Sequence, residues 1–290
     1  MHEVTNLIIN KLRFLYSYVK SKFFGFLYQR RFNKIKTFCL FIGYPRSGHS
    51  LVASLLDAHP NIIIGMEWGV LPHIKLGYKK KQIFYSLIRN SFLYSNKMNN
   101  IWTGYSYKVP NSWQGKYKTL QVIGDKQGAR TSIYLKRNPD LLPKLENIIS
   151  QKPKLIHVIR NPFDIITTIT FRIFENSNIK KSPEDVDLLP FIKYFFERAE
   201  FVKILKEQNN YDVFDLYHED FIKNPEKHLK NLLLFLDLKA NIDYLKACTS
   251  IVYSMPNVSR LRLKWPPELI QYVEKKLSDY PFLSHYKYHN

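Results

Sequence analysis

A glycine turn carries the clearest chemical signal in the chain. Residues 43–60 read GYPRSGHSLVASLLDAHP, and Gly43, Gly48, His49 and Ser50 have the spacing of a phosphate-binding loop. Glycines in such a loop let successive backbone N–H groups point inward, and the following helix offers unsatisfied amides and a positive dipole end to an anion. The turn is therefore predicted to hold a phosphate-like group.

This turn differs from the loop of nucleoside triphosphatases. Those enzymes need Lys where this chain has His49, and an apolar strand that ends in a metal-holding Asp. The apolar run KLIHVIR ends instead in Arg160, which would repel magnesium. A magnesium-dependent NTPase or small-molecule kinase is therefore disfavoured, and no metal site is expected.

Segments typical of strands alternate along the chain with segments of helical character, and together they would position the turn. Apolar runs typical of strands occupy residues 37–42, 61–65, 120–126, 154–160 and 211–220. Helical character is found at residues 50–58, 164–174, 188–208, 226–236 and 267–277, and polar loops are expected at 89–100 and 176–185. This alternation predicts an α/β fold with a central parallel sheet, helices on both faces and ligands at the carboxyl ends of the strands.

Length and composition predict one main domain. The 290 residues are 45% hydrophobic, enough for a large core, and we divide them into a domain of residues 37–290 and an N-terminal basic and aromatic helical appendage of residues 1–36. Cations interrupt the appendage too often for a membrane span. It could lie on an anionic membrane surface or pack on the domain as an ordinary helix. Two cysteines make no disulfide framework, which favours a reducing, cytoplasmic setting that could be membrane-peripheral.

The formal charge of +20 leaves two interpretations open. It favours an anionic partner, which includes nucleotides, sulfated or phosphorylated substrates and membrane surfaces. It is equally explained by compositional drift toward Lys, Asn, Ile and Tyr on a solvated surface. No specific nucleic-acid partner is expected.

Three motifs together resemble one enzyme family. YPRSGHS, running into LVASLLDAHP, is similar to the 5′-phosphosulfate loop of sulfotransferases that use 3′-phosphoadenosine 5′-phosphosulfate (PAPS), in the style of the tyrosylprotein and carbohydrate enzymes. RNPFDIITT resembles the family's 3′-phosphate motif, with Arg160 and, eight residues later, Thr168 in place of Ser. LYHEDFIKNPEKHLKNLLLFLDL resembles the late Tyr-Glu-Asp segment, represented by Tyr217. The resemblance implies a P-loop-like sulfotransferase fold.

The resemblance also implies which residues bind the donor. The 5′-phosphosulfate would be held by Arg46, Ser47, Gly48, His49 and Ser50. Arg46 stands where many members have Lys and can clamp oxygens bidentately, whereas His49 replaces the usual Thr. The remaining expected cofactor contacts are Arg160, Thr168, Tyr217, Arg260 and Arg262, the last two, along with Lys264, by position and charge.

The catalytic residues implied by the resemblance are Glu67, Lys126 and Arg46. A hydroxyl acceptor must lose a proton, and Glu67 stands one residue later than the base of the tyrosylprotein enzymes. Lys126 resembles the strand-end Lys that contacts the transferred sulfate. Glu67 could instead be a carboxylate at a helix N-terminus, and Lys126 a solvated turn residue. Among the histidines considered as bases, His59, His73 and His157, only His73 remains as an alternative.

The function predicted is sulfuryl transfer from PAPS to a hydroxyl acceptor, which the basic surface suggests is anionic. A glycan, a tyrosine and a small alcohol stay open as acceptors. The alternative is a non-catalytic basic protein that keeps the nucleotide fold and binds nucleic acid or membrane.

Overall fold

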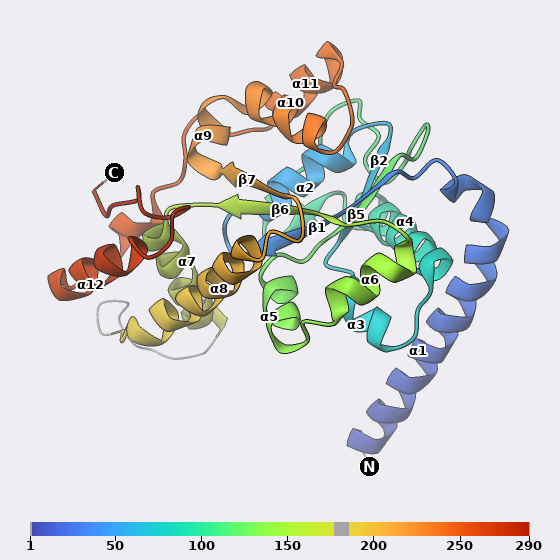
Figure 1. Ribbon diagram of the computed structural model, residues 1–290, viewed down its shortest axis with the longest axis horizontal. Coiled ribbons are helices and arrows are strands. Elements are labelled where there is room, and N and C mark those ends of the chain that lie inside the picture. Colours follow the sequence, from blue (N-terminus) through green and yellow to red (C-terminus); the bar gives the residue numbers. More distant parts are fainter. Residues whose placement is uncertain (1, 177–185, 290) are drawn as a thin grey trace.

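The computed structural model describes residues 2–176 and 186–289, and a five-stranded parallel sheet lies at its centre (Figure 1). The strands follow the spatial order β2-β5-β1-β6-β7. Their bounds are β1 (Thr37–Gly43), β2 (Ile62–Met66), β5 (Val122–Lys126), β6 (Lys154–Ile159) and β7 (Val213–Tyr217). This confirms the predicted parallel sheet and places β1 in the middle of it.

The central strand is buried on both faces because its apolar run is continuous. Phe38, Leu40 and Ile42 belong to one hydrophobic cluster, whereas Cys39 and Phe41 belong to the other. Alternate residues of a strand point to opposite faces, so β1 contributes to both clusters.

Helices cover both faces, as predicted (Figure 1). One face carries α2 (His49–Asp57), α9 (His218–Lys223), α10 (Pro225–Phe235) and α11 (Ile242–Thr249). The other cluster draws on α3 (Val70–Lys75), α5 (Ala129–Arg137), α6 (Leu141–Ile149), α7 (Pro162–Asn176), α8 (Leu189–Glu207) and α12 (Pro267–Leu277). All five predicted helices are therefore found within two residues of their expected bounds.

Two segments differ from the sequence-based expectation. Residues 89–100 are not a loop, since α4 (Lys80–Lys97) continues through most of them. Leu87, Ser91 and Tyr94 form its buried stripe at helical spacing, which the surrounding polar residues obscured. The predicted run 211–220 ends as a strand at Tyr217, where α9 begins. Of the expected loop 176–185, residues 177–185 lie outside the described part of the chain.

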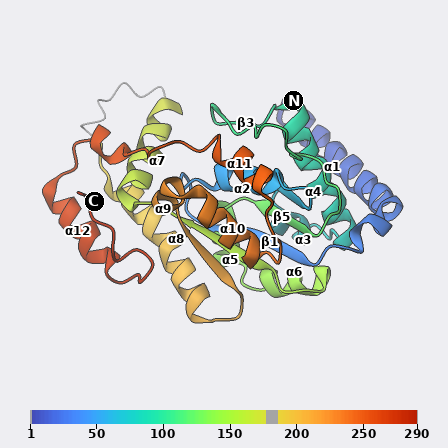
Figure 2. The ribbon, with the colours of Figure 1, turned by 90° about the horizontal axis from the view of Figure 1, so that it is seen from above.

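The N-terminal appendage forms α1 (His2–Leu27), followed by the short helix η1 (Gln29–Phe32). Helix α1 lies along α4, at the end of the molecule opposite α12 (Figure 2). Within the described residues no helix has both the length and the apolar character that crossing a bilayer requires. The division of the chain at residue 36 stays a prediction.

Two small elements complete the structure around the strand ends. A hairpin pairs β3 (Ile101–Trp102) with β4 (Tyr105–Ser106) through Thr103 and Gly104, both with positive φ. Near the C-terminus, the 3₁₀ helix η3 (Ser259–Arg262) packs against α7.

Candidate active site

A cavity of about 710 Å³ opens at the carboxyl ends of the strands. It is large enough for a nucleotide-sized ligand, and its position is that expected for a parallel α/β sheet. Nine of the residues singled out from the sequence line it: Arg46, Gly48, His49, Ser50, Glu67, Lys126, Arg160, Thr168 and Arg262. The structure thus brings both predicted anion-binding regions onto one cavity.

The glycine turn joins β1 to the N-terminus of α2. Gly48 has φ 100°, and a Cβ built on it would lie 2.4 Å from Cδ2 of His218, so no other residue fits there without displacing that ring. Because Gly48 has no side chain, it cannot cap the first amides of α2. These amides and the helix dipole therefore make the N-terminus of α2, which opens on the cavity, suited to an anion.

The ring of His49 turns under the loop rather than toward a ligand. Its Nε2 donates to the carbonyl oxygen of Ile42 (3.0 Å), and its Nδ1 lies 3.1 Å from Oγ of Ser47. Burial, reinforced by the charge of Lys126, lowers the pKa of His49 to about 3, so the ring is neutral. His49 braces the loop, and Ser47 is buried beside it without lining the cavity.

Three groups converge where β2, β5 and α2 meet. Nζ of Lys126 lies 2.9 Å from Oε1 of Glu67 and 3.1 Å from Oγ of Ser50. The Lys126 side chain is 2% exposed, whereas that of Glu67 is 29% exposed. Burial lowers the pKa of Lys126 and the charge of Glu67 opposes that change. We call Ser50, Glu67 and Lys126 the transfer end of the cavity.

Asp125 fixes the backbone that presents Glu67. Glu67 has φ 55°, a left-handed conformation that costs free energy in a residue with a Cβ. The carboxylate of Asp125 accepts the N–H groups of Trp68 (3.2 Å), Gly69 (2.9 Å) and Val70 (2.7 Å), directly after that residue. The carboxylate at the N-terminus of α3 is therefore Asp125, and Glu67 is turned into the cavity instead.

Arg160 ties the glycine turn to the C-terminal segment. Its guanidinium donates to the carbonyl oxygens of Arg46 (3.1 Å) and Asn257 (2.6 Å) and to Oγ of Ser259 (3.1 Å). Burial lowers the pKa of Arg160, although an arginine stays charged at neutral pH. The predicted 3′-phosphate arginine therefore lines the cavity and contacts the turn predicted to bind the other end of the donor.

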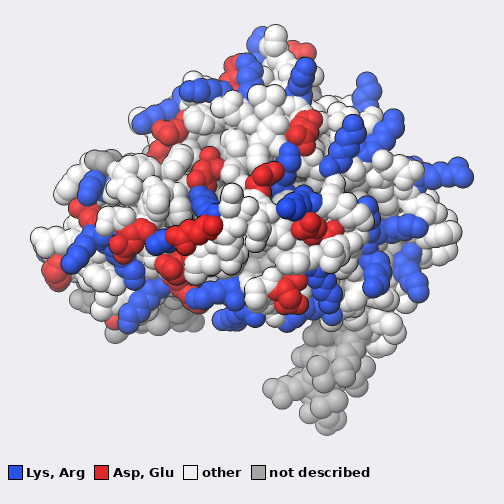
Figure 3. Space-filling model, viewed as in Figure 1, with Lys and Arg blue, Asp and Glu red and all other residues white. Residues whose placement is uncertain are grey.

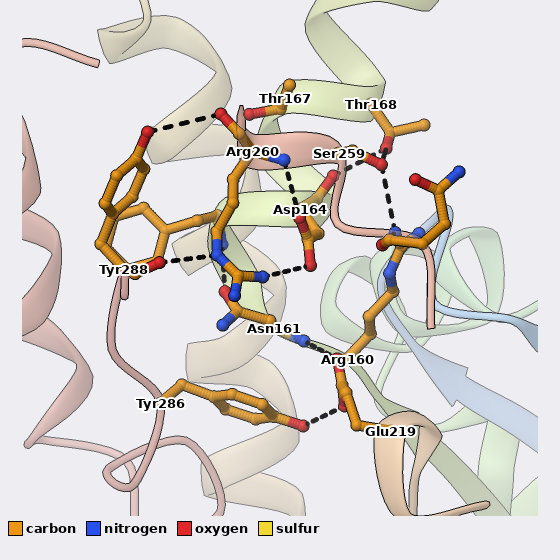
Figure 4. A network of polar contacts seen from close by, with 12 residues as sticks. Arg160, Asn161, Asp164, Thr167, Thr168, Glu219, Ser259, Arg260, Tyr286 and Tyr288 are labelled. Carbon is orange, nitrogen blue, oxygen red and sulfur yellow. Dashed lines mark hydrogen bonds and ion pairs between the residues drawn. The ribbon is translucent and has the colours of Figure 1, made fainter. Parts of the chain in front are cut away.

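Ser259 brings together the two residues of the 3′-phosphate motif (Figure 4). Its Oγ accepts from the guanidinium of Arg160 at 3.1 Å and lies 3.1 Å from Oγ1 of Thr168. The Thr168 hydroxyl donates its proton to the backbone oxygen of Asp164 in α7. We call Arg160, Thr168 and Ser259 the nucleotide end of the cavity.

Arg260 lies behind the nucleotide end rather than among the residues that line the cavity. Its guanidinium pairs with Asp164 at 2.7 Å and donates to the backbone oxygen of Tyr288 at 2.6 Å (Figure 4). The backbone N–H of Arg260 also donates to Asp164. The Asp164–Arg260 pair holds η3 against α7. Arg262 lines the cavity, and its guanidinium lies over the ring of Phe171.

Tyr217 is not among the residues that line the cavity, and its neighbour His218 takes that place. The ring of Tyr217 packs on His285, whereas His218 starts α9 and lies against Gly48. Burial, together with the charge of Arg160, lowers the pKa of His218 to about 3. The signal for His218 was present in the sequence, one position after Tyr217 at a strand end.

The three histidines considered as bases have other partners. His59 lies just after α2, and its Nε2 lies 3.1 Å from the backbone oxygen of Lys239 rather than near a residue of the cavity. His73 stacks on Trp68, with ring centroids 3.9 Å apart. His157 is buried in β6 between Asp215 and the hydroxyl of Tyr44, as its place in an apolar strand predicted. None of the three lines the cavity.

The β3–β4 hairpin forms a wall that the sequence analysis missed. Trp102, Tyr105 and Tyr107 line the cavity, and Nζ of Lys126 lies 5.2 Å from the centre of the Trp102 ring. Arg172 of α7 reaches the backbone oxygen of Thr103 at 3.2 Å. A Thr-Gly turn between aromatic residues is a hairpin signal that could have located this wall.

The chain is similar in sequence to known proteins. Residues 40–241 match the family model described as the sulfotransferase family. The chain belongs to the sulfotransferase family. This sulfotransferase is 22% identical over 214 residues to Protein-tyrosine sulfotransferase A of Caenorhabditis elegans, with 71% of this chain and 51% of that protein covered. It therefore spans about half the length of that curated relative.

Solved sulfotransferase structures are among those similar to this chain. A sulfotransferase from Mycobacterium avium is similar with a TM-score of 0.50 at 12% identity, covering 84% of this chain and 76% of that one. Mouse sulfotransferase in complex with PAP gives a TM-score of 0.43 at 16% identity, covering 80% and 69%. At 12% identity the Mycobacterium avium structure supports the P-loop-like architecture and nothing finer.

Proposed function

We propose that this protein transfers the sulfuryl group of PAPS to a hydroxyl acceptor, with Glu67 as the general base. The observation that carries the proposal is the convergence of Glu67, Lys126 and Ser50 on the cavity that Arg160 also lines. An enzyme of this kind needs a base near the acceptor, cations near the transferred group and a separate anchor for the nucleotide.

The nucleotide end fits the 3′-phosphate of the donor. Nε of Arg160 and Nδ1 of His218 are buried, and neither has a hydrogen-bond partner within the described residues. Buried polar atoms without partners are costly, and a bound anion or base edge would satisfy them. Arg160, Thr168 and Ser259 would then hold the 3′-phosphate, while the turn from Arg46 to Ser50 and the N-terminus of α2 hold the 5′-phosphosulfate.

The transfer end supplies the groups that the reaction needs. The acceptor oxygen attacks sulfur as its proton passes to the Glu67 carboxylate, and the bond between sulfur and the bridging oxygen breaks. The electron pair stays on that oxygen, so charge builds on the departing 5′-phosphate of adenosine 3′,5′-bisphosphate. Lys126, which contacts Ser50 and Glu67, would stabilise that charge together with the hydroxyl of Ser50 and the α2 amides.

The wall of the cavity favours an aromatic acceptor that carries negative charge. Trp102, Tyr105 and Tyr107 offer aromatic surface, and Arg130 and Arg172 add positive charge to the lining of the same cavity. A tyrosine in an acidic peptide combines both features, and a protein-tyrosine sulfotransferase is among the relatives. We therefore propose this acceptor first, ahead of a glycan or a small alcohol.

Labelled sulfate transfer tests the proposal. The full chain is incubated with PAPS carrying ³⁵S and, in separate reactions, with a tyrosine peptide rich in Asp and Glu, its Phe analogue, a glycan and a simple phenol. We expect label on the tyrosine peptide, none on the Phe analogue, and loss of transfer in Glu67→Gln. The control is Glu197→Gln, which changes another Glu–Lys pair, an exposed one with Lys136, and should transfer normally.

Two results would contradict the proposal at different levels. Transfer to the glycan or the phenol alone would overturn the acceptor assignment and leave sulfuryl transfer intact. Binding of adenosine 3′,5′-bisphosphate with no transfer to any acceptor would favour the non-catalytic nucleotide-fold alternative.

A further inference from the structure

The net positive charge of the chain is concentrated in its first 124 residues, because acidic residues are scarce there. They hold 18 of the 44 Lys and Arg but 3 of the 24 Asp and Glu, so they carry +15 of the net +20. Between residues 4 and 124 the acidic residues are Asp57, which is buried, and Glu67, which pairs with Lys126. Compositional drift would act along the whole chain, so this asymmetry points to a partner for one side of the molecule.

Figure 3 shows the same asymmetry on the surface. Blue Lys and Arg side chains with almost no red beside them gather toward the side where α1 and η1 lie, whereas red and blue alternate across the centre and the opposite side. Exposed cations in this region are Lys22, Arg30, Arg31, Lys34 and Lys36. Such a field attracts anionic surfaces.

Helix α1 uses one face to pack on α4. A Cβ on Gly25 would lie 2.7 Å from the carbonyl oxygen of Lys81, so the two backbones approach closely at that glycine. The amide of Gln82 donates to Oγ of Ser21 at 3.2 Å, and the rings of Phe24 and Tyr85 stack with centroids 5.4 Å apart. This face fixes the orientation of α1 on the domain.

The opposite face of α1 is apolar and exposed. Its large side chains are 55–64% exposed and comprise Leu12, Leu15, Tyr16, Val19, Phe23, Phe26 and Leu27. At about 100° per residue these positions form one stripe roughly 120° wide. Lys20 and Lys22 lie at the two edges of this stripe. We call these seven residues the outer stripe.

We propose that the outer stripe and the surrounding cations dock this protein onto an anionic lipid surface, with α1 lying in the interface. An apolar arc bordered by lysines is the pattern of an interfacial helix, because the arc enters the acyl boundary while the cations meet lipid phosphates. A nucleic acid would neutralise the cations but leave the outer stripe in water. A second copy of the chain would cover the stripe but bring two strongly basic surfaces together. An anionic bilayer satisfies both features.

Vesicle co-sedimentation of the full chain tests this inference independently of sulfuryl transfer. We expect binding to vesicles of phosphatidylcholine mixed with phosphatidylserine, little binding to phosphatidylcholine alone, and weakening as salt rises. The double variant Leu15→Gln, Phe23→Gln should bind at least about ten-fold more weakly, because it removes apolar area from the interface. The matched control is Leu234→Gln, Ile242→Gln, at positions 60% and 69% exposed on α10 and α11, and it should bind normally.

Circular dichroism and thermal unfolding show whether the variants keep the fold, and analytical ultracentrifugation measures the oligomeric state. Equal binding of the wild type and the outer-stripe variant to anionic vesicles would overturn the proposal. So would an absence of vesicle binding, a stripe-dependent dimer that does not bind vesicles, or stripe-independent binding of duplex DNA in preference to vesicles.

Discussion

The two ends of the cavity are built in different ways. The transfer end consists of residues at strand ends and in the first turn of α2: Glu67 directly after β2, Lys126 at the end of β5 and Ser50 in α2. The nucleotide end depends on the C-terminal segment, since Arg160 reaches Asn257 and Ser259, and Thr168 reaches Ser259. The sheet and α2 therefore form the transfer end. The nucleotide end also requires the distant C-terminal segment, which the Asp164–Arg260 pair holds against α7.

This difference predicts that chemistry and donor binding can be separated by mutation. Changes at the transfer end should act on kcat, because its groups meet charge that develops during the reaction. Changes at the nucleotide end should act on donor affinity, because a 3′-phosphate is bound equally in the ground state and the transition state.

The largest effect is expected for Glu67→Gln. Loss of a general base lowers kcat by about 10²–10⁴-fold. Affinity for adenosine 3′,5′-bisphosphate should stay within about three-fold, since Glu67 is proposed to act on the acceptor and not on the nucleotide. Steady-state kinetics and calorimetry measure the two quantities. Equal losses in both would show that Glu67 supports the fold of the cavity rather than proton transfer.

Replacement of Arg160 should lower donor affinity much more than kcat. Arg160→Gln removes the charge predicted to meet the 3′-phosphate and should weaken bisphosphate binding by about 100-fold, the value of a strong charge-assisted contact. At saturating donor, kcat should fall much less. Because Arg160 also holds the backbone at Arg46 and Asn257, thermal unfolding must accompany the titration. A variant that keeps its stability and its affinity would remove Arg160 from the donor site.

The pH dependence tests the role of Lys126. Burial lowers the pKa of Lys126, so its positive charge is lost at a lower pH than that of an ordinary lysine. We expect kcat/KM to fall on the alkaline side for this reason. In Lys126→Arg that fall should move to higher pH, because arginine keeps its charge. An alkaline limb that does not move would assign the titration to another group.

The smallest effect is expected for Ser259→Ala. This change removes the hydroxyl between Arg160 and Thr168 and should weaken bisphosphate binding by about five-fold, in line with one net hydrogen bond. Tyr217→Phe is the matched comparison, since the Tyr217 ring packs on His285 and does not line the cavity. A larger loss in Tyr217→Phe than in Ser259→Ala would reverse the assignment of these two residues.

The same contrast explains how far the sequence could predict the site. Lys126 and Ser50 follow from a strand end and a glycine turn, which local patterns reveal. Ser259 could not be identified in this way, because its role depends on η3 packing against α7 far away in the sequence. Arg260 was expected at the donor because of its charge, but the nearby Asp164 pairs with it instead.

His49 shows a second limit of sequence-based prediction. Its position in the loop is that of a phosphate contact, yet the ring fits beneath the turn against Ile42 and Ser47. A Cβ on Gly128 would lie 2.5 Å from Nδ1 of that ring, so a glycine in a different segment makes room for it. Such a steric fit is determined by tertiary packing and cannot be predicted from the local sequence pattern.

The most direct test of the account is the contribution of the 3′-phosphate to binding. Isothermal titration calorimetry of the wild-type protein compares adenosine 3′,5′-bisphosphate with adenosine 5′-monophosphate. The account predicts that the bisphosphate binds at least about 100-fold more tightly, because its second phosphate meets Arg160, Thr168 and Ser259. Equal affinity for the two nucleotides, or binding of neither, would contradict it.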